Sequence, residues 1–284
     1  MDIYSDDPGL ASTVSERFCA PDADLIIRSS DGILFKVHRQ NLAAHSEAFF
    51  SASLISSTST DESGPTEAAT SKGISQEDIV EFTEDSKTLD LLLQFMYRQR
   101  QPNITNLKYS QLMALAEAAE KYEVYAAMGT CVAVFESKFI DSNSLGIFKF
   151  ARKHGYPNLV DKTAPRVLHR SEDLQKSALV DLRLRWHTYF DRCVPIVWKE
   201  FIDLLDSSPC SCRSWPKTET LILRVVGGKP HALMNRACLD DKSLQTTPAC
   251  CTKALANIRT ALKKKLLADA TLPTFSSIND DYSF

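Results

Sequence analysis

Five cysteines that lie within about forty residues of one another near the end of the chain have the clearest capacity for chemistry. They are Cys210, Cys212, Cys238, Cys250 and Cys251. Four thiolates gathered tetrahedrally bind zinc, and a pair of Cys-x-x-Cys steps is the spacing typical of such sites. This segment instead has one Cys-x-Cys step and one adjacent pair, and its single histidine, His231, more often caps a turn than binds a metal. The spacing favours buried or surface thiols, so we assign no metal ligand; a zinc-stabilised tail is the minor alternative.

Catalytic motifs are absent from the sequence. It contains no Walker loop, no G-x-G-x-x-G, no G-x-S-x-G and no H-E-x-x-H, which are the patterns that position phosphates, dinucleotides, nucleophilic serines and zinc-bound water. Carboxylates are numerous, but no motif pairs one of them with a nucleophile. We therefore expect no enzyme activity, no catalytic residue and no cofactor, and keep a catalytic C-terminal domain as a lesser alternative.

The composition is typical of a globular protein. The chain has 284 residues, enough for about two domains, of which 44% are hydrophobic and 24% charged. Its net charge of −3 argues against a concentrated basic face for nucleic acid. Acidic residues stand where a secretory signal has lysines, and no apolar run approaches the ~20 residues needed to cross a bilayer. We expect reduced thiols, no nucleic-acid or membrane partner, and a location in the cytoplasm, the nucleus or both.

Two β-rich runs between Asp24 and Val37 form the first structural signal. Asp31 and Gly32 separate them, and an Asp-Gly step between apolar runs predicts a β-hairpin, because glycine supplies the positive φ of a tight turn. The following HRQNLAAHSEAFFSASL has the apolar spacing of one or two short helices, with Ser46 as a cap between them. The expected order is therefore strand, strand, helix, helix.

Two segments are predicted to be disordered. Residues 56–77 are rich in Ser and Thr and contain too few apolar side chains to offset the entropy of ordering the chain. We also expect residues 1–17 to form a disordered N-terminal segment.

Helical patterns dominate the rest of the chain. DIVEF at 78–82 predicts a strand, and three helices follow it up to Phe135. We predict a helical extension over 137–206, in which Pro195 interrupts a helix, and a Cys-containing, partly irregular helical tail over 207–284. The residues after Pro273 are expected to be frayed.

Three separated blocks carry a family resemblance. They are PDADLIIRSSDGILFKVHRQNLAAHSEAFF, VEFTEDSKTLDLLLQFMY and ALAEAAEKYEV. In this order they resemble the BTB/POZ domain, and more narrowly that of fungal BTB-domain proteins, over residues 18–136. The resemblance implies an α+β fold in which helices flank a small β-sheet, followed by an α-helical C-terminal extension.

The resemblance also implies a function. BTB domains are protein-interaction modules, so we expect the chain to form a homodimer and to bind a protein partner that the sequence does not identify. The alternative is a substrate adaptor for a cullin-RING ubiquitin ligase. Cullin-binding relatives have, before their third strand, a hydrophobic residue followed two places later by Glu. The insertion at 56–77 lacks this pattern, which argues against a cullin as partner through that mode.

Six residues carry the site predictions. The resemblance implies that Asp24 and Arg39 pair in a charged pocket. The alternative is that Asp24 only terminates a strand and that the Arg39 side chain lies in water. We interpret His38, at the strand-to-helix junction, as a hydrogen-bonded core histidine rather than a catalytic one. The last three positions form an expected apolar self-association surface on the helix at 41–50. They are Leu42, Phe49 and Phe50.

Overall fold

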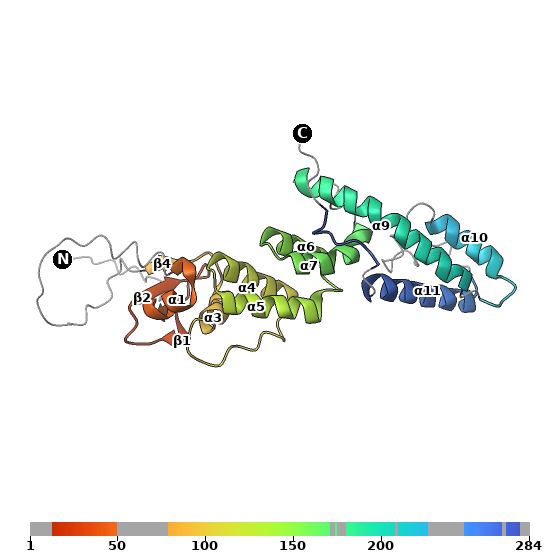
Figure 1. The fold of residues 1–284 in the computed structure, drawn as a ribbon. Helices are drawn as coiled ribbons and strands as arrows, with labels where there is room; N and C mark the ends of the chain where they lie inside the picture. The colour runs from red at the N-terminus through yellow and green to blue at the C-terminus, as the bar shows by residue number, and fades with distance from the viewer. Residues whose placement is uncertain are drawn as a thin grey trace, which may run out of the picture. The chain divides into compact units, whose positions relative to one another are not determined.

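The computed structural model describes residues 13–49, 79–170, 174, 180–207, 210–226, 247–268 and 271–278. The chain divides into two compact units, Met1–Lys138 and Phe139–Phe284. In the described residues the first unit combines a sheet with helices and the second is helical (Figure 1). The predicted α+β class with a helical C-terminal part is therefore confirmed. The predicted loop at 56–77 and most of the N-terminal segment lie outside the described residues.

A four-stranded mixed sheet organises the first unit. Its strand order is β1-β3-β2-β4, with β2 and β3 antiparallel and the two outer strands parallel to their neighbours. The strands are β1 (Val14–Cys19), β2 (Leu25–Arg28), β3 (Leu34–Val37) and β4 (Ile79–Glu81). Gly32 turns the β2–β3 hairpin with a φ of 84°, which confirms the predicted turn.

The N-terminal strand corrects one prediction. β1 begins at Val14, inside the segment that we expected to be disordered up to residue 17. Val14 pairs with Leu34, and the Leu34 amide donates a hydrogen bond to the Thr13 carbonyl over 2.9 Å. Pairing with a distant strand orders these residues, and a local composition argument does not detect such pairing.

The central hairpin has one buried face. Leu25, Ile27, Phe35 and Val37 are each at most 4% exposed, whereas the residues that alternate with them are only partly buried. This period of two is what a strand with one face on the core requires.

Helices supply the rest of the first core. They are α1 (Arg39–His45), α3 (Ser86–Gln94), α4 (Tyr109–Lys121), α5 (Tyr125–Val134) and a π-helical turn, η2 (Phe135–Phe139). The Asp85 carboxylate caps α3 by accepting from the Thr88 amide over 2.8 Å. Buried leucines of α3 and α4 form the centre of the unit; they are Leu89, Leu92, Leu93, Leu112 and Leu115.

The regular elements of the second unit are all helices in its described residues. Its elements are α6 (Ser144–Lys153), α7 (Pro157–Thr163), the 3-10 helix η3 (Ala164–Arg170), α9 (Val180–Ser207), α10 (Trp215–Val226) and α11 (Ala249–Ala268). Within this unit α11 lies alongside α9 (Figure 1). The connection from α6 to α7 turns at Gly155, whose φ of 76° is one that glycine adopts without strain.

α9 continues through Pro195, which corrects the predicted interruption. The helix is unbroken over 28 residues with Pro195 inside it. One continuous stripe of side chains on either side of the proline is buried: Trp186, Tyr189, Cys193, Val197, Phe201 and Leu205. Burial of this stripe outweighs the single backbone hydrogen bond that proline removes.

The segment at 271–278 is docked, which corrects the predicted fraying for residues 274–278; residues 279–284 lie outside the described residues. Leu272, Phe275 and Ile278 are at most 7% exposed. The Asp161 carboxylate accepts hydrogen bonds from the amide, over 2.8 Å, and the hydroxyl of Ser276. The Arg185 guanidinium donates to the Ile278 carbonyl over 3.0 Å. These contacts hold the segment on the second unit.

Candidate functional site

Asp24 acts on the backbone of α1. Its carboxylate accepts a hydrogen bond from the Arg39 backbone N–H, with 2.8 Å between Oδ1 and N. Arg39 is the first residue of α1, so the bond satisfies an amide that a helix N-terminus leaves unpaired. Within the described residues no ion pair joins the two side chains, and both residues are exposed. The predicted carboxylate–guanidinium pocket is wrong, because the helix start presents its amide to Asp24.

His38 lies between Asp22 and Tyr97. Its Nε2 is 3.4 Å from the Asp22 carboxylate, and its Nδ1 is 3.1 Å from the Tyr97 hydroxyl. The His38 backbone N–H also donates to this hydroxyl over 3.0 Å. Burial raises the pKa of Tyr97. Both ring nitrogens therefore have partners, which suits a histidine that fixes the β3–α1 junction.

The predicted self-association surface is buried at Leu42 and partly buried at Phe49. Leu42 is 1% exposed and belongs to the core. Phe49 is partly buried in a stack of rings, with centroids 5.8 Å from Phe82 and 5.6 Å from Tyr122. Phe50 lies outside the described residues. An apolar helix face can be buried in the core of its own domain or against a partner protein. The sequence pattern is the same in both cases.

A carboxylate anchors this ring stack. Glu84 accepts hydrogen bonds from the Tyr122 hydroxyl over 2.7 Å and from the Lys121 ammonium over 2.9 Å. The Phe82 and Tyr122 rings stack with centroids 4.7 Å apart. The segment after β4 is thereby tied to the end of α4.

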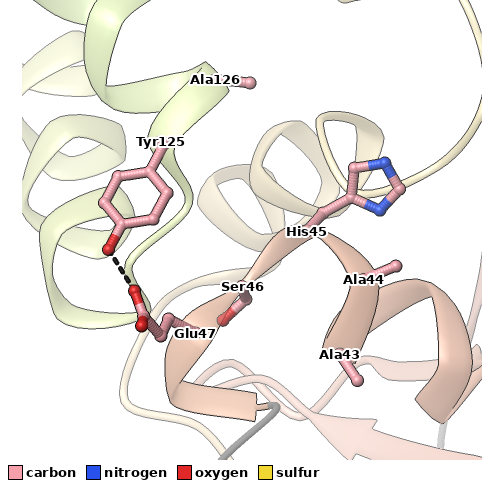
Figure 2. Close-up of a pocket in the computed structure, with 7 residues that line it drawn as sticks. All are labelled: Ala43, Ala44, His45, Ser46, Glu47, Tyr125 and Ala126. Atoms are coloured by element: carbon pink, nitrogen blue, oxygen red, sulfur yellow. Dashed lines mark hydrogen bonds between the residues drawn. The ribbon is translucent and has the colours of Figure 1, made fainter.

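Beside the stack, α1 and α5 border an open pocket of about 400 Å³. Its lining is Ala43, Ala44, His45, Ser46, Glu47, Tyr125 and Ala126 (Figure 2). The Ser46 hydroxyl donates to the Tyr122 carbonyl, and the Tyr125 hydroxyl donates to the Glu47 carboxylate. Tyr125 is nevertheless 60% exposed, which is the largest exposure among the large apolar side chains of the described residues.

A comparison with protein families assigns the first unit to a known domain family. Residues 17–138 match the BTB/POZ domain. The chain contains a BTB/POZ domain. The match covers the last three residues of β1, the other three strands and α1 to α5, including every surface residue described above. A search of curated proteins found no match.

The BTB domain is a protein-interaction module rather than a catalytic one. Its pocket is lined by small and polar side chains, and sequence reasoning missed Tyr125 and Ala126 as surface residues. The signal for them was helical spacing: Val124, Ala127 and Cys131 form the buried stripe of α5, and Tyr125 and Ala126 lie off that stripe. None of the helices in the described part of the chain is long and apolar enough to cross a membrane.

Four of the five tail cysteines lie together outside the BTB domain. The Sγ atoms of Cys210, Cys212, Cys250 and Cys251 all lie within 4.8 Å of one another. The fifth, Cys238, lies outside the described residues. Hydrogen bonding with Cys251 lowers the pKa of the Cys212 thiol to about 7. The sequence analysis did not predict this cluster, because the spacing of cysteines along the chain does not show that the starts of α10 and α11 lie close together.

Proposed function

We propose that the chain is an interaction protein whose BTB domain self-associates into a homodimer and binds a further protein partner. The match of residues 17–138 to the BTB/POZ domain carries this proposal, because BTB domains mediate self-association and the binding of other proteins.

The surface around the α1–α5 pocket supports this proposal. Tyr125 presents a 60% exposed ring on the α5 side of the pocket, whose lining also includes the small side chains of Ala44 and Ala126 (Figure 2). Tyrosine is enriched at the energetic centres of interfaces, because its ring buries a large area at a small entropic cost. Small neighbouring side chains leave room for a partner's side chains. We therefore assign the self-association surface to this pocket and not to the buried Leu42.

The test measures the molar mass of the full chain in solution. Light scattering at micromolar concentration should give twice the 31.7 kDa of one chain. Ala126→Arg places a charge in the pocket, where a partner would bury it without a counter-charge, so we expect the dimer dissociation constant to rise at least about tenfold.

Ala133→Arg is the matched control. It is the same substitution at another exposed alanine of α5, outside the pocket, and should leave the dimer unchanged. A monomeric wild-type chain would refute self-association, and equal effects of the two variants would refute the assigned surface. Affinity purification with mass spectrometry then identifies the partner. Recovery of a cullin would support the ligase-adaptor alternative, which no described residue favours.

A further inference from the structure

Two helix starts in the second unit bring four thiols to one point. Cys210 and Cys212 lie five and three residues before α10 begins at Trp215, while Cys250 and Cys251 are the second and third residues of α11. Cys212 and Cys251 are 39 residues apart in sequence, yet their Sγ atoms are 3.2 Å apart. In Figure 1 the first turns of α10 and α11 lie at the same end of the unit, near the last turn of α9.

The sulfur positions fit a tetrahedral metal ion. Zinc–sulfur bonds of about 2.3 Å in tetrahedral geometry place the sulfurs ~3.8 Å apart. Here one pair is 3.2 Å apart and no pair exceeds 4.8 Å, so small side-chain rotations convert the cluster into that geometry. The four cysteines are free, and 3.2 Å is well beyond the length of a disulfide bond, about 2.05 Å.

The cluster lies close to groups that hydrogen bond to sulfur. Both pairs lie at helix N-termini, whose unpaired amides and dipole favour thiolates. The Ser214 backbone amide hydrogen bonds to Cys212. Neither α10 nor α11 has an acidic residue in its first turn. An amide that donates to sulfur is the kind of outer-shell contact that orients a metal-binding cysteine.

We propose that Cys210, Cys212, Cys250 and Cys251 bind one zinc ion through four thiolates. Four protein ligands fill a tetrahedral ion, which makes this a structural site rather than a catalytic one. Each ligand binds as a thiolate, so the remaining thiol protons pass to solvent when zinc enters. The ion joins the start of α10 to the start of α11 and so closes the chain between them. Cys251 is fully buried, and Cys250 is the exposed member of the set.

Metal analysis of the full chain, purified in a reducing buffer, tests the site. We expect about one zinc ion per chain, as a single tetrathiolate site requires. Replacement of zinc by cobalt should give the strong visible bands of a tetrahedral ion together with sulfur-to-cobalt charge transfer. Cys212→Ser and Cys251→Ser should lose most of the zinc and this spectrum. Cys19→Ser in the BTB domain and Cys238→Ser in the tail are matched controls and should keep both.

One variant keeps the test decisive if a cysteine-to-serine chain fails to fold. Cys250→His replaces the exposed ligand by another zinc ligand, and a Cys3His site should retain cobalt with a shifted spectrum. Wild-type chain that holds no zinc and gives no cobalt spectrum would overturn the proposal. A disulfide among the four cysteines in alkylated protein, bound iron instead of zinc, or loss of zinc from Cys238→Ser would overturn it as well.

Discussion

Asp24 stabilises α1 by accepting a hydrogen bond from the Arg39 backbone amide. This contact determines how much stability substitutions at Asp24 and at Arg39 are expected to cost. The carboxylate caps the helix from the position just before β2. Arg39 contributes its amide, which every residue other than proline possesses, so its side chain is replaceable. Substitution of Arg39 therefore distinguishes the two kinds of contact: it would break a salt bridge between side chains, but it leaves a hydrogen bond to the backbone amide in place.

Removing the cap should lower stability, whereas removing the guanidinium should not. We expect Asp24→Ala to reduce the free energy of unfolding by about 0.5–2 kcal/mol, the usual cost of losing a helix cap. Arg39→Ala should change it by less than about 0.5 kcal/mol, as exposed substitutions do. Denaturant unfolding of both variants and of the double variant should show additive costs. A coupling energy above about 1 kcal/mol would instead indicate a side-chain pair.

Glu84 should make the BTB domain sensitive to acid. Burial raises the pKa of Glu84, but hydrogen bonds from Lys121, Tyr122 and Thr83 together outweigh burial and hold the pKa below its usual value of 4.5. A carboxyl whose pKa is lower in the folded state stabilises that state above its unfolded pKa. This stabilisation is lost as the pH falls through the folded pKa.

Glu84→Gln tests this residue by urea unfolding of the full chain. We expect the variant to be less stable than wild type at pH 7, with the difference shrinking steadily below about pH 4.5. Glu81→Gln, at an exposed carboxylate paired with Arg28, is the control and should have a smaller effect. A stability difference for Glu84→Gln that does not change with pH would contradict the titration.

At the scale of elements, α9 shows packing overriding a local signal. Its buried stripe runs past Pro195, which is itself exposed. The proline therefore contributes little to packing, while it removes a backbone hydrogen bond inside the helix.

Replacing this proline should stabilise the second unit. We expect Pro195→Ala to raise the free energy of unfolding by about 1–3 kcal/mol, because alanine restores the amide donor. Arg192→Ala, at an exposed position one turn earlier, should have almost no effect. Thermal denaturation of both variants makes the comparison. A lower melting temperature for Pro195→Ala would show that α9 depends on the proline.

The docked segment at 271–278 should depend on Phe275. Its ring is 3% exposed and lies 5.3 Å from the Phe148 ring and 5.5 Å from the Tyr189 ring, centroid to centroid. We expect Phe275→Ala to reduce the free energy of unfolding by about 3–5 kcal/mol. Ser277→Ala, at an exposed position of the same segment, is the control. Equal melting temperatures for the two variants would show that the segment does not stabilise the unit.

At the scale of the whole molecule, the two compact units have separate cores. The leucines of α3 and α4 form the first, and the aromatic cluster around Trp186 forms the second. Units with their own cores are expected to unfold as separate cooperative transitions.

The same variants test this independence in the full chain. We expect Glu84→Gln to shift one thermal transition and Phe275→Ala to shift the other, because each residue contacts the core of one unit. Calorimetry of the two variants and the wild type measures both transitions. If each variant moved every transition by the same amount, the two units would unfold as one.

The sequence determined the features that arise from neighbouring residues. The Asp31–Gly32 turn, the alternation in β2 and β3, and the leucine periodicity of α3 and α4 are local patterns. These patterns can be recognised in the sequence alone, because the periods of strands and helices follow from backbone geometry. The order of these elements, with the three sequence blocks, was enough to predict the BTB domain.

The tertiary structure decided which residues from distant segments come into contact and which side chains are buried. It placed Leu42 in the core, the Arg39 amide on Asp24, and residues 14–17 beside β3. It also brought Cys212 and Cys251 together from the starts of two helices. The physical reason is the same in each case: burial, pairing and metal geometry depend on distances across the fold, and spacing along the chain does not set those distances.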